Sequence, residues 1–262
     1  MKKNNDELGS ILSDKEREVF PGVFHRRHFL RGSLVSAAIA VLAKATPMNL
    51  LAQEAPKSQT AVTGRLTWDD FLKQAIPVAQ QLIADPMFNV DEYLYRIGSL
   101  ATRLKELPDS KLGPYTEVDS RVWFGPSYRG SPFLIIQWRM EPGAFLPPHN
   151  HPNASVCTLG FEGEVRLRNF EIVGDPPDYE SGKTFRVRET HNDTMTHGRI
   201  STLSPFRDNI HCFQVGKEGA RGIDINTMLG ASAPFSFLNI GAQPVDAEKR
   251  LFEATWSKIG RK

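Results

Sequence analysis

Two histidines separated by one residue, His149 and His151, are the feature of this sequence most suited to chemistry. Prolines lie on both sides of them, at positions 147, 148 and 152. Side chains two residues apart on an extended segment point to the same side, so the pair can bind one metal ion. Prolines stiffen the approach and lower the entropy cost of holding the pair in place. The alternative is a pair of loop histidines that bind no metal.

His211 opens the apolar run 211–215 and is the third candidate ligand, although a strand histidine that only packs is the alternative. His191 and His197 lie in a polar stretch, where solvated loop histidines are the more common case. Either could still be an extra ligand or an acid–base group, because an unperturbed imidazole titrates near neutral pH.

The sequence predicts helices in the first part of the chain and strands in the part that carries these histidines. Thr67 and the acids after it resemble a helix start, and Asp91 and Glu92 resemble a second one, with apolar residues at helical spacing after each. Pro77 is expected to kink or restart the first helix. From about residue 117, short apolar runs alternate with glycine and proline turns, which is typical of an all-β sandwich or barrel. These runs are 122–124, 133–138, 165–173, 184–187, 199–203, 211–215 and 222–225.

Two motifs then resemble a known family. The spacing Gly143-x5-His149-x-His151 is similar to the first half of the cupin metal motif, although Ser155 and Val156 stand where many cupins have a glutamate. The segments 147–163 and 207–213 resemble the thiol dioxygenase branch of cupins, the plant cysteine oxidase and cysteamine dioxygenase family. The resemblance covers roughly residues 117–240.

The resemblance implies a mainly β cupin fold, a double-stranded β-helix or jelly-roll barrel, preceded by a short α-helical segment. It implies an Fe(2+) centre held by His149, His151 and His211, and the addition of O₂ to a small thiol to give a sulfinate. Asp224 falls where the family tends to have an acid, so it is the catalytic candidate, either orienting a ligand histidine or holding a substrate amine. An ordinary hydrogen-bonded core acid is the alternative.

This sequence departs from the family at positions that bear on the substrate. No lysine follows the histidine pair in the segment 157–160, Phe235 stands where the family has a tyrosine, and a polar stretch is inserted at 175–196. Two other hypotheses therefore stay open: another metal-dependent cupin enzyme acting on a non-thiol, and a ligand-binding cupin without catalysis.

Arg139, Arg166 and Arg168 alternate with apolar neighbours, which is typical of an exposed strand face, although one could instead bind a carboxylate.

The N-terminal region resembles a twin-arginine export signal. Arg26 and Arg27 are followed by Phe29 and Leu30 and then by the mild apolar run 32–43. That run is shorter than the about 20 residues that span a membrane, so no stable membrane span is expected. We expect the twin-arginine machinery as a partner and a periplasmic or otherwise exported protein, cleaved after residue 45 or 52 or left tethered. An amphipathic surface helix is the alternative.

Composition and charge narrow the remaining classes of function. The 262 residues carry a formal net charge of +2, which argues against nucleic-acid binding by bulk electrostatics. The two cysteines, Cys157 and Cys212, could pair in an oxidising compartment, but buried packing thiols are the favoured interpretation. The predicted organisation is a signal region at 1–52, a linker at 53–66, a helical segment at 67–116 and a cupin barrel with a C-terminal tail at 117–262.

Overall fold

The computed structural model describes residues 64–85, 89–230 and 235–258. The predicted export signal and the linker up to residue 63 lie outside these residues. All of the helices and strands below belong to one compact unit of the chain. None of its described helices is both long and apolar enough to cross a membrane.

Two helices precede the sheet. Helix α1 spans Trp68–Ala84 and α2 spans Val90–Ala101, and the side chains of Thr67 and Asn89 cap their first turns. Pro77 lies inside α1, which continues through it as one helix rather than restarting there. The last part of the predicted helical segment 67–116 is not helical, because it includes strand β1, Gly113–Tyr115.

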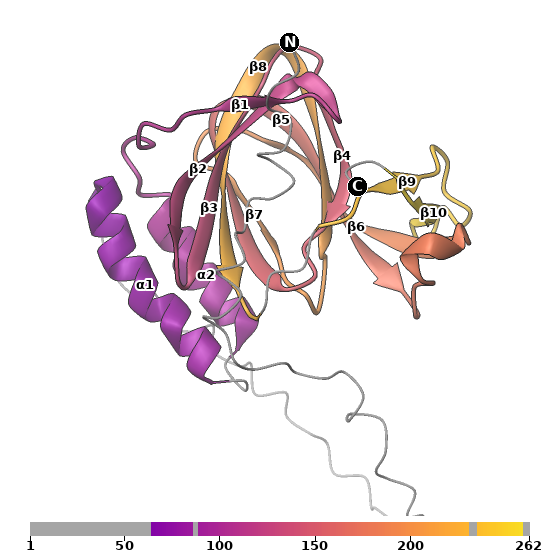
Figure 1. Ribbon diagram of the computed structural model, residues 1–262, viewed down its shortest axis with the longest axis horizontal. Coiled ribbons are helices and arrows are strands. Elements are labelled where there is room, and N and C mark those ends of the chain that lie inside the picture. The colour runs from indigo at the N-terminus through magenta and orange to yellow at the C-terminus, as the bar shows by residue number, and fades with distance from the viewer. Residues whose placement is uncertain (1–63, 86–88, 231–234, 259–262) are drawn as a thin grey trace, which may run out of the picture. The chain divides into compact units, whose positions relative to one another are not determined.

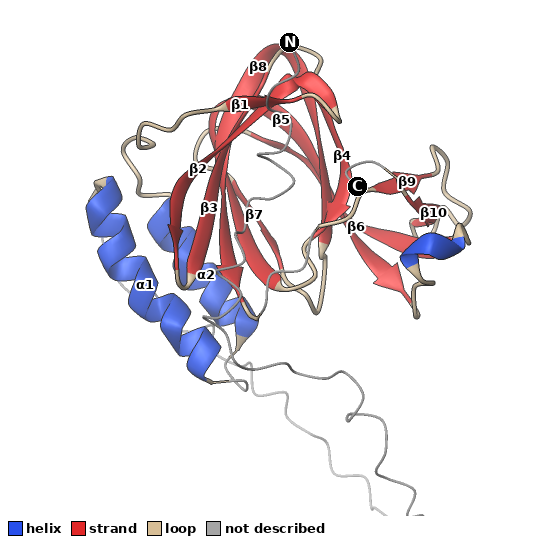
Figure 2. Cartoon of the chain, in the orientation of Figure 1, coloured by secondary structure: helices blue, strands red, loops and turns tan. Residues whose placement is uncertain are grey.

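The rest of the unit is an antiparallel sheet that curls into two facing layers, as Figures 1 and 2 show. The predicted mainly β fold class with a short helical segment in front is confirmed. The other strands are β2 Asp119–Gly130, β3 Phe133–Met140, β4 Phe145–Asn150, β5 Ala154–Val173, β6 Phe185–Met195, β7 Ile200–Leu203, β8 Ile210–Met228, β9 Leu238–Ile240 and β10 Leu251–Trp256.

The long strands β5 and β8 belong to both layers. Residues 154–163 of β5 and 220–228 of β8 pair with each other, and β7 and β3 lie on either side of them in the first layer. Residues 165–170 of β5 and 210–215 of β8 pair in the second layer, with β6 and β4 on either side. Both strands turn the corner at glycines with positive φ, Gly163 and Gly219, where another residue would be strained.

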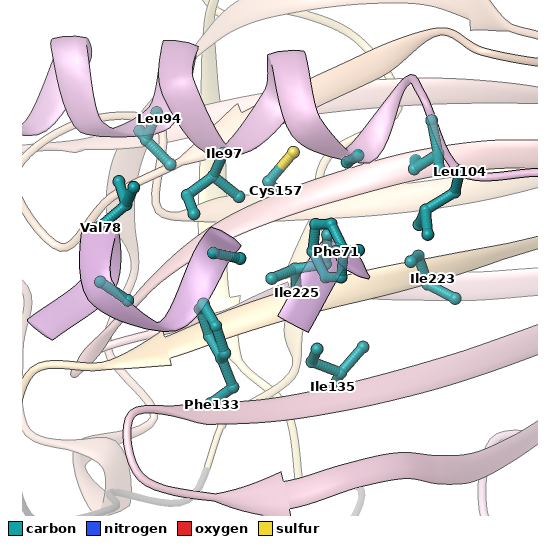
Figure 3. Close-up of a cluster of buried hydrophobic side chains, with 14 of the residues drawn as sticks. Phe71, Val78, Leu94, Ile97, Leu104, Phe133, Ile135, Cys157, Ile223 and Ile225 are labelled. Atoms are coloured by element: carbon teal, nitrogen blue, oxygen red, sulfur yellow. The ribbon is translucent and has the colours of Figure 1, made fainter. Parts of the chain in front are cut away.

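The three largest apolar clusters hold this arrangement together. One fills the interior between the layers and includes Trp138 and Phe213. Another lies under α1 and α2 and joins their apolar faces to Ile135, Ile223 and Ile225 on the outer side of the first layer, as Figure 3 shows. The third lies on the outer side of the second layer under β9 and β10. Burial of these faces on both sides of the sheet makes the layers a rigid support for a site between them.

The two cysteines agree with the sequence prediction, whereas the inserted polar stretch differs from it. Cys157 and Cys212 are buried, unpaired thiols in different apolar clusters, so the packing interpretation is confirmed. Half of the polar stretch 175–196 is strand β6, which places His191 on a strand rather than in the predicted loop. Pairing with β5 along nearly the whole of β6 explains this, because the polar residues 191–194 all have partners in the ladder.

Candidate metal centre

The three predicted ligands meet at one point between the layers. His149 of β4 pairs directly with His211 of β8, and His151 follows β4 by one residue. The Nε2 atom of His211 lies 2.9 Å from Nε2 of His149 and 3.0 Å from Nε2 of His151. All three ligand atoms lie within 4.8 Å of one another. The histidines are therefore placed as one donor cluster.

Local hydrogen bonding sets how His149 presents its ring. Its Nδ1 lies 2.9 Å from the carbonyl oxygen of Pro147, which can only accept a hydrogen bond. A neutral His149 must therefore carry its proton on Nδ1, which leaves the lone pair on Nε2 facing the other two rings. The proline before the ligand thus contributes a carbonyl group that orients it, besides stiffening the strand.

Burial keeps all three rings uncharged. It lowers the pKa of His149 to about 4, with the hydrogen bond to Pro147 acting in the opposite direction. It also lowers the pKa values of His151 and His211 well below the usual range, and the neighbouring imidazoles lower them further. Metal ions bind the neutral form of imidazole, so at neutral pH no proton has to be displaced from these rings.

The donor set fits a first-row metal ion. A single proton on Nε2 of His211 could form a hydrogen bond to only one of the two nitrogen atoms close to it. A cation placed among the three nitrogen lone pairs would instead attract all three. Two ligand atoms that each lie about 2.1 Å from a metal ion, at a right angle to one another, are about 3 Å apart. The two Nε2–Nε2 distances from His211 agree with this value. Nδ1 of His211 is buried and, among the described residues, has no hydrogen-bond partner. The three histidines form a metal-binding site, and their chemistry suits several ions of the first row.

Aromatic rings and one amide surround the cluster. Phe213 packs against His211, while Phe235 and Phe237 both contact His149. Asn150, between the two ligands of the pair, accepts a hydrogen bond of 2.7 Å from the backbone N–H of Ser236. This bond ties the segment carrying both phenylalanines to the ligand strand. Phe235 is half exposed, so it places a ring without a hydroxyl group on the solvent side of the site.

Asp224 lies on the layer opposite the histidines. Asn169, which pairs with His211, donates to the hydroxyl of Ser201 at 3.0 Å across the interior. Ser201 pairs with Thr158, and Thr158 pairs with Asp224 and donates to its carboxylate at 2.7 Å. This row of buried polar groups puts the Asp224 carboxyl on the wall facing the cluster. Its side-chain hydrogen bond is to Thr158 rather than to a histidine ring.

Burial raises the pKa of Asp224 to about 7, and the Thr158 hydroxyl and the Trp138 indole offset part of that rise. Between about pH 4 and pH 7 the folded protein therefore keeps a proton that the unfolded chain releases, so this group makes stability fall as pH rises and then level off. We expect Asp224→Asn to remove that dependence. The free energy of unfolding of the variant, minus that of the wild type, should grow by on the order of 2 kcal/mol from about pH 5 to about pH 8 in urea titrations. Parallel curves for the two proteins would contradict the assignment.

The other singled-out residues lie apart from the cluster. His191 and His197 are exposed, and Nδ1 of His197 lies 2.6 Å from the carbonyl oxygen of Phe161. The row made by Asn169, Ser201 and Thr158 carries no motif that sequence reasoning could have recognised, because it is assembled across the two layers. Asn150 was visible between the two histidines, but its partner is far away in sequence.

Comparisons with known proteins give limited similarities, and no family model matches the chain. The chain is 22% identical over 162 residues to a Dictyostelium discoideum protein described as a probable 2-aminoethanethiol dioxygenase, covering 59% of this chain and 72% of that one. Among solved structures, the cupin domain of Schizosaccharomyces pombe Cnp3 has a TM-score of 0.34 at 14% identity, over 47% of this chain and 72% of that chain. An oxalate oxidase has a TM-score of 0.34 at 19% identity, over 48% of this chain and 59% of that chain. The chain thus spans most of the dioxygenase and less than two thirds of the oxalate oxidase.

Proposed function

We propose that this protein is a non-haem iron thiol dioxygenase, which adds both atoms of O₂ to the sulfur of a small thiol to give a sulfinate. The observation that carries the proposal is the convergence of three histidines on one point, with no carboxylate among the described residues of that cluster. The similarity to a protein described as a probable 2-aminoethanethiol dioxygenase agrees with it.

The chemistry of the ligand set explains why a thiol suits this site. Three neutral imidazoles leave the full double charge on a bound Fe(2+), unlike a set of two histidines and a carboxylate. When bound there, the iron would supply a positive centre for a thiolate and positions open to O₂. His149, His151 and His211 would hold that centre, and the carbonyl of Pro147 keeps the His149 ring in the required tautomer.

The surrounding residues would orient the substrate and limit access of water. Phe213, Phe235 and Phe237 contact the ligand rings and keep that side of the site apolar. Asp224 faces the cluster from the other layer and, in its ionised form, could accept a hydrogen bond from a substrate amine three bonds from the sulfur. A cationic amine beside it would lower its pKa, because an opposite charge favours the carboxylate. We therefore place small aminothiols first among the substrates.

The experiment that tests the function is O₂ consumption by the Fe(2+)-loaded full chain. Cysteine, cysteamine, 3-mercaptopropionate and a peptide with N-terminal cysteine form the panel. We expect uptake of one O₂ per thiol with at least one member, with sulfinate as product by mass spectrometry. His149→Ala should reduce the rate by at least about 100-fold, since ligand loss exceeds the cost of losing a partner of a ligand.

His191→Ala is the matched control, because that histidine is exposed on β6 and should leave the rate unchanged. If iron-loaded protein consumes no O₂ with any of these thiols, the dioxygenase proposal fails. Turnover of a non-thiol would then assign the site to another metal-dependent reaction, and a metal-loaded protein without turnover would point to a binding function.

We also propose, on the sequence alone, that the chain is exported through the twin-arginine machinery. Its N-terminal pair Arg26 and Arg27 is the feature that supports this. Replacing both by lysine should leave the protein in the cytoplasm of a bacterial host, as measured by cell fractionation and immunoblotting. Equal amounts of wild type and variant outside the cytoplasm would refute the signal.

A further inference from the structure

A groove of about 440 Å³ lies on the outer side of the second layer, where it shares two strands with the metal centre. Cys212 and Gln214 of β8 and Pro147 and Pro148 of β4 form one side of it, and Leu238–Ile240 of β9 form another. Since side chains alternate along β8, Cys212 faces this groove while its neighbour His211 faces the interior. The groove is therefore separate from the metal centre, and its volume is typical of a small-molecule site.

The charge on the lining is positive. Arg166 and Arg168 of β5 line the groove, and none of the described residues around it is acidic. Arg168 contacts the carboxylate of Glu189, but this carboxylate is already shared. Arg168 lies 2.5 Å and Arg250 2.7 Å from its oxygens. Arg166 donates from Nε to the neutral amide of Asn192, and in the described part of the chain it has no carboxylate partner. The forked end of Arg166 is thus the site of unmatched charge.

Arg168, unlike Arg166, is held in place by its neighbours, and the opposite wall of the groove is apolar. Its guanidinium lies 4.8 Å from the ring of Phe170 and 5.3 Å from that of Phe252, so stacking and the bond to Glu189 both fix it. Across the groove, Phe145 is 39% exposed and the apolar side chain of Ile240 also lines it, whereas Leu238 is buried. Exposed apolar surface beside a guanidinium fork is the combination that recognises an anion carrying a hydrocarbon part.

We propose that this groove binds a small monocarboxylate with an apolar tail, with the carboxylate on Arg166 and the tail along Phe145 and Ile240. Charge complementarity selects the anion, since Arg166 has no carboxylate partner and no acid is found among the described residues that line the groove. The planar fork of arginine matches the two oxygens of a carboxylate. This site is independent of the proposed dioxygenase activity, because none of the three metal ligands lines it.

The test is calorimetric titration of the full chain with octanoate, with and without bound Fe(2+). We expect saturable binding of one octanoate per chain, the same in both metal states, and roughly tenfold weaker binding of octan-1-ol, which has no charge. Arg166→Gln should weaken octanoate binding by about tenfold, and Arg166→Lys should recover part of it. Arg199→Gln is the control, because that exposed arginine does not line the groove and should change nothing.

Three outcomes would overturn the proposal. Octan-1-ol binding as tightly as octanoate would show an apolar surface without anion recognition. An unchanged affinity in Arg166→Gln would place the carboxylate elsewhere. Binding that appears only with Fe(2+) present would assign octanoate to the metal centre instead of the groove.

Discussion

Replacing His211 by alanine is expected to abolish metal binding. His211 is the central member of the cluster, because its Nε2 is the atom within 3.0 Å of both other donors. Its removal leaves two histidines on one short segment and opens a space in a fully buried wall. Losing a partner of a metal ligand costs about 10- to 100-fold in affinity, so losing a central ligand should cost more. The metal content after dialysis should fall from near one to near zero per chain, as measured by plasma emission spectrometry.

A matched variant keeps this prediction interpretable. His191→Ala removes an exposed imidazole from β6 and should retain full metal content. Circular dichroism must show that His211→Ala is folded, and His211→Gln, which fills more of the space, serves if it is not. A folded variant at position 211 that keeps a full complement of iron would remove this histidine from the ligand set.

The ligands could be predicted because their signals are local. The alternation of side chains along a strand brings His149 and His151 to one side, and this rule needs no knowledge of the rest of the chain. Linking His211 to them needed the family resemblance, since no local rule says that its strand pairs with β4. The structure supplies that link through the direct pairing of His149 with His211.

The contacts that cross between layers could not be predicted in the same way. Asn169 and Ser201 meet only because β5 bends at Gly163 and carries its second half into the other layer. A glycine with positive φ is not recognisable as a corner from its residue type alone. Residues 191–194 were missed for another reason, because their polar side chains do not indicate a strand and pairing with β5 in the same layer is what holds them there. Interlayer contacts therefore decided the parts of the site that sequence patterns missed.

Replacing Phe213 by alanine is expected to cause the largest loss of stability among the substitutions considered. Phe213 is fully buried in the interior cluster, and its ring lies 5.3 Å from that of Trp138 on the facing layer and 4.7 Å from that of His211. Truncating a buried phenylalanine costs about 3–5 kcal/mol, because the transfer free energy is lost and a cavity remains. Urea titration should show this loss directly as a lower free energy of unfolding.

The same substitution should weaken metal binding, because the ring of Phe213 packs in an edge contact against the imidazole of His211. A comparison of metal-free and metal-loaded protein separates the two effects, since a ligand that binds only the folded state adds stability according to its affinity. We expect the stabilisation by metal to be smaller in Phe213→Ala than in the wild type. Phe206→Ala is the control, because that ring is 79% exposed and its loss should change stability by less than about 0.5 kcal/mol. If Phe213→Ala matched this control in metal-free protein, the interior cluster would not be what holds the two layers around the metal centre.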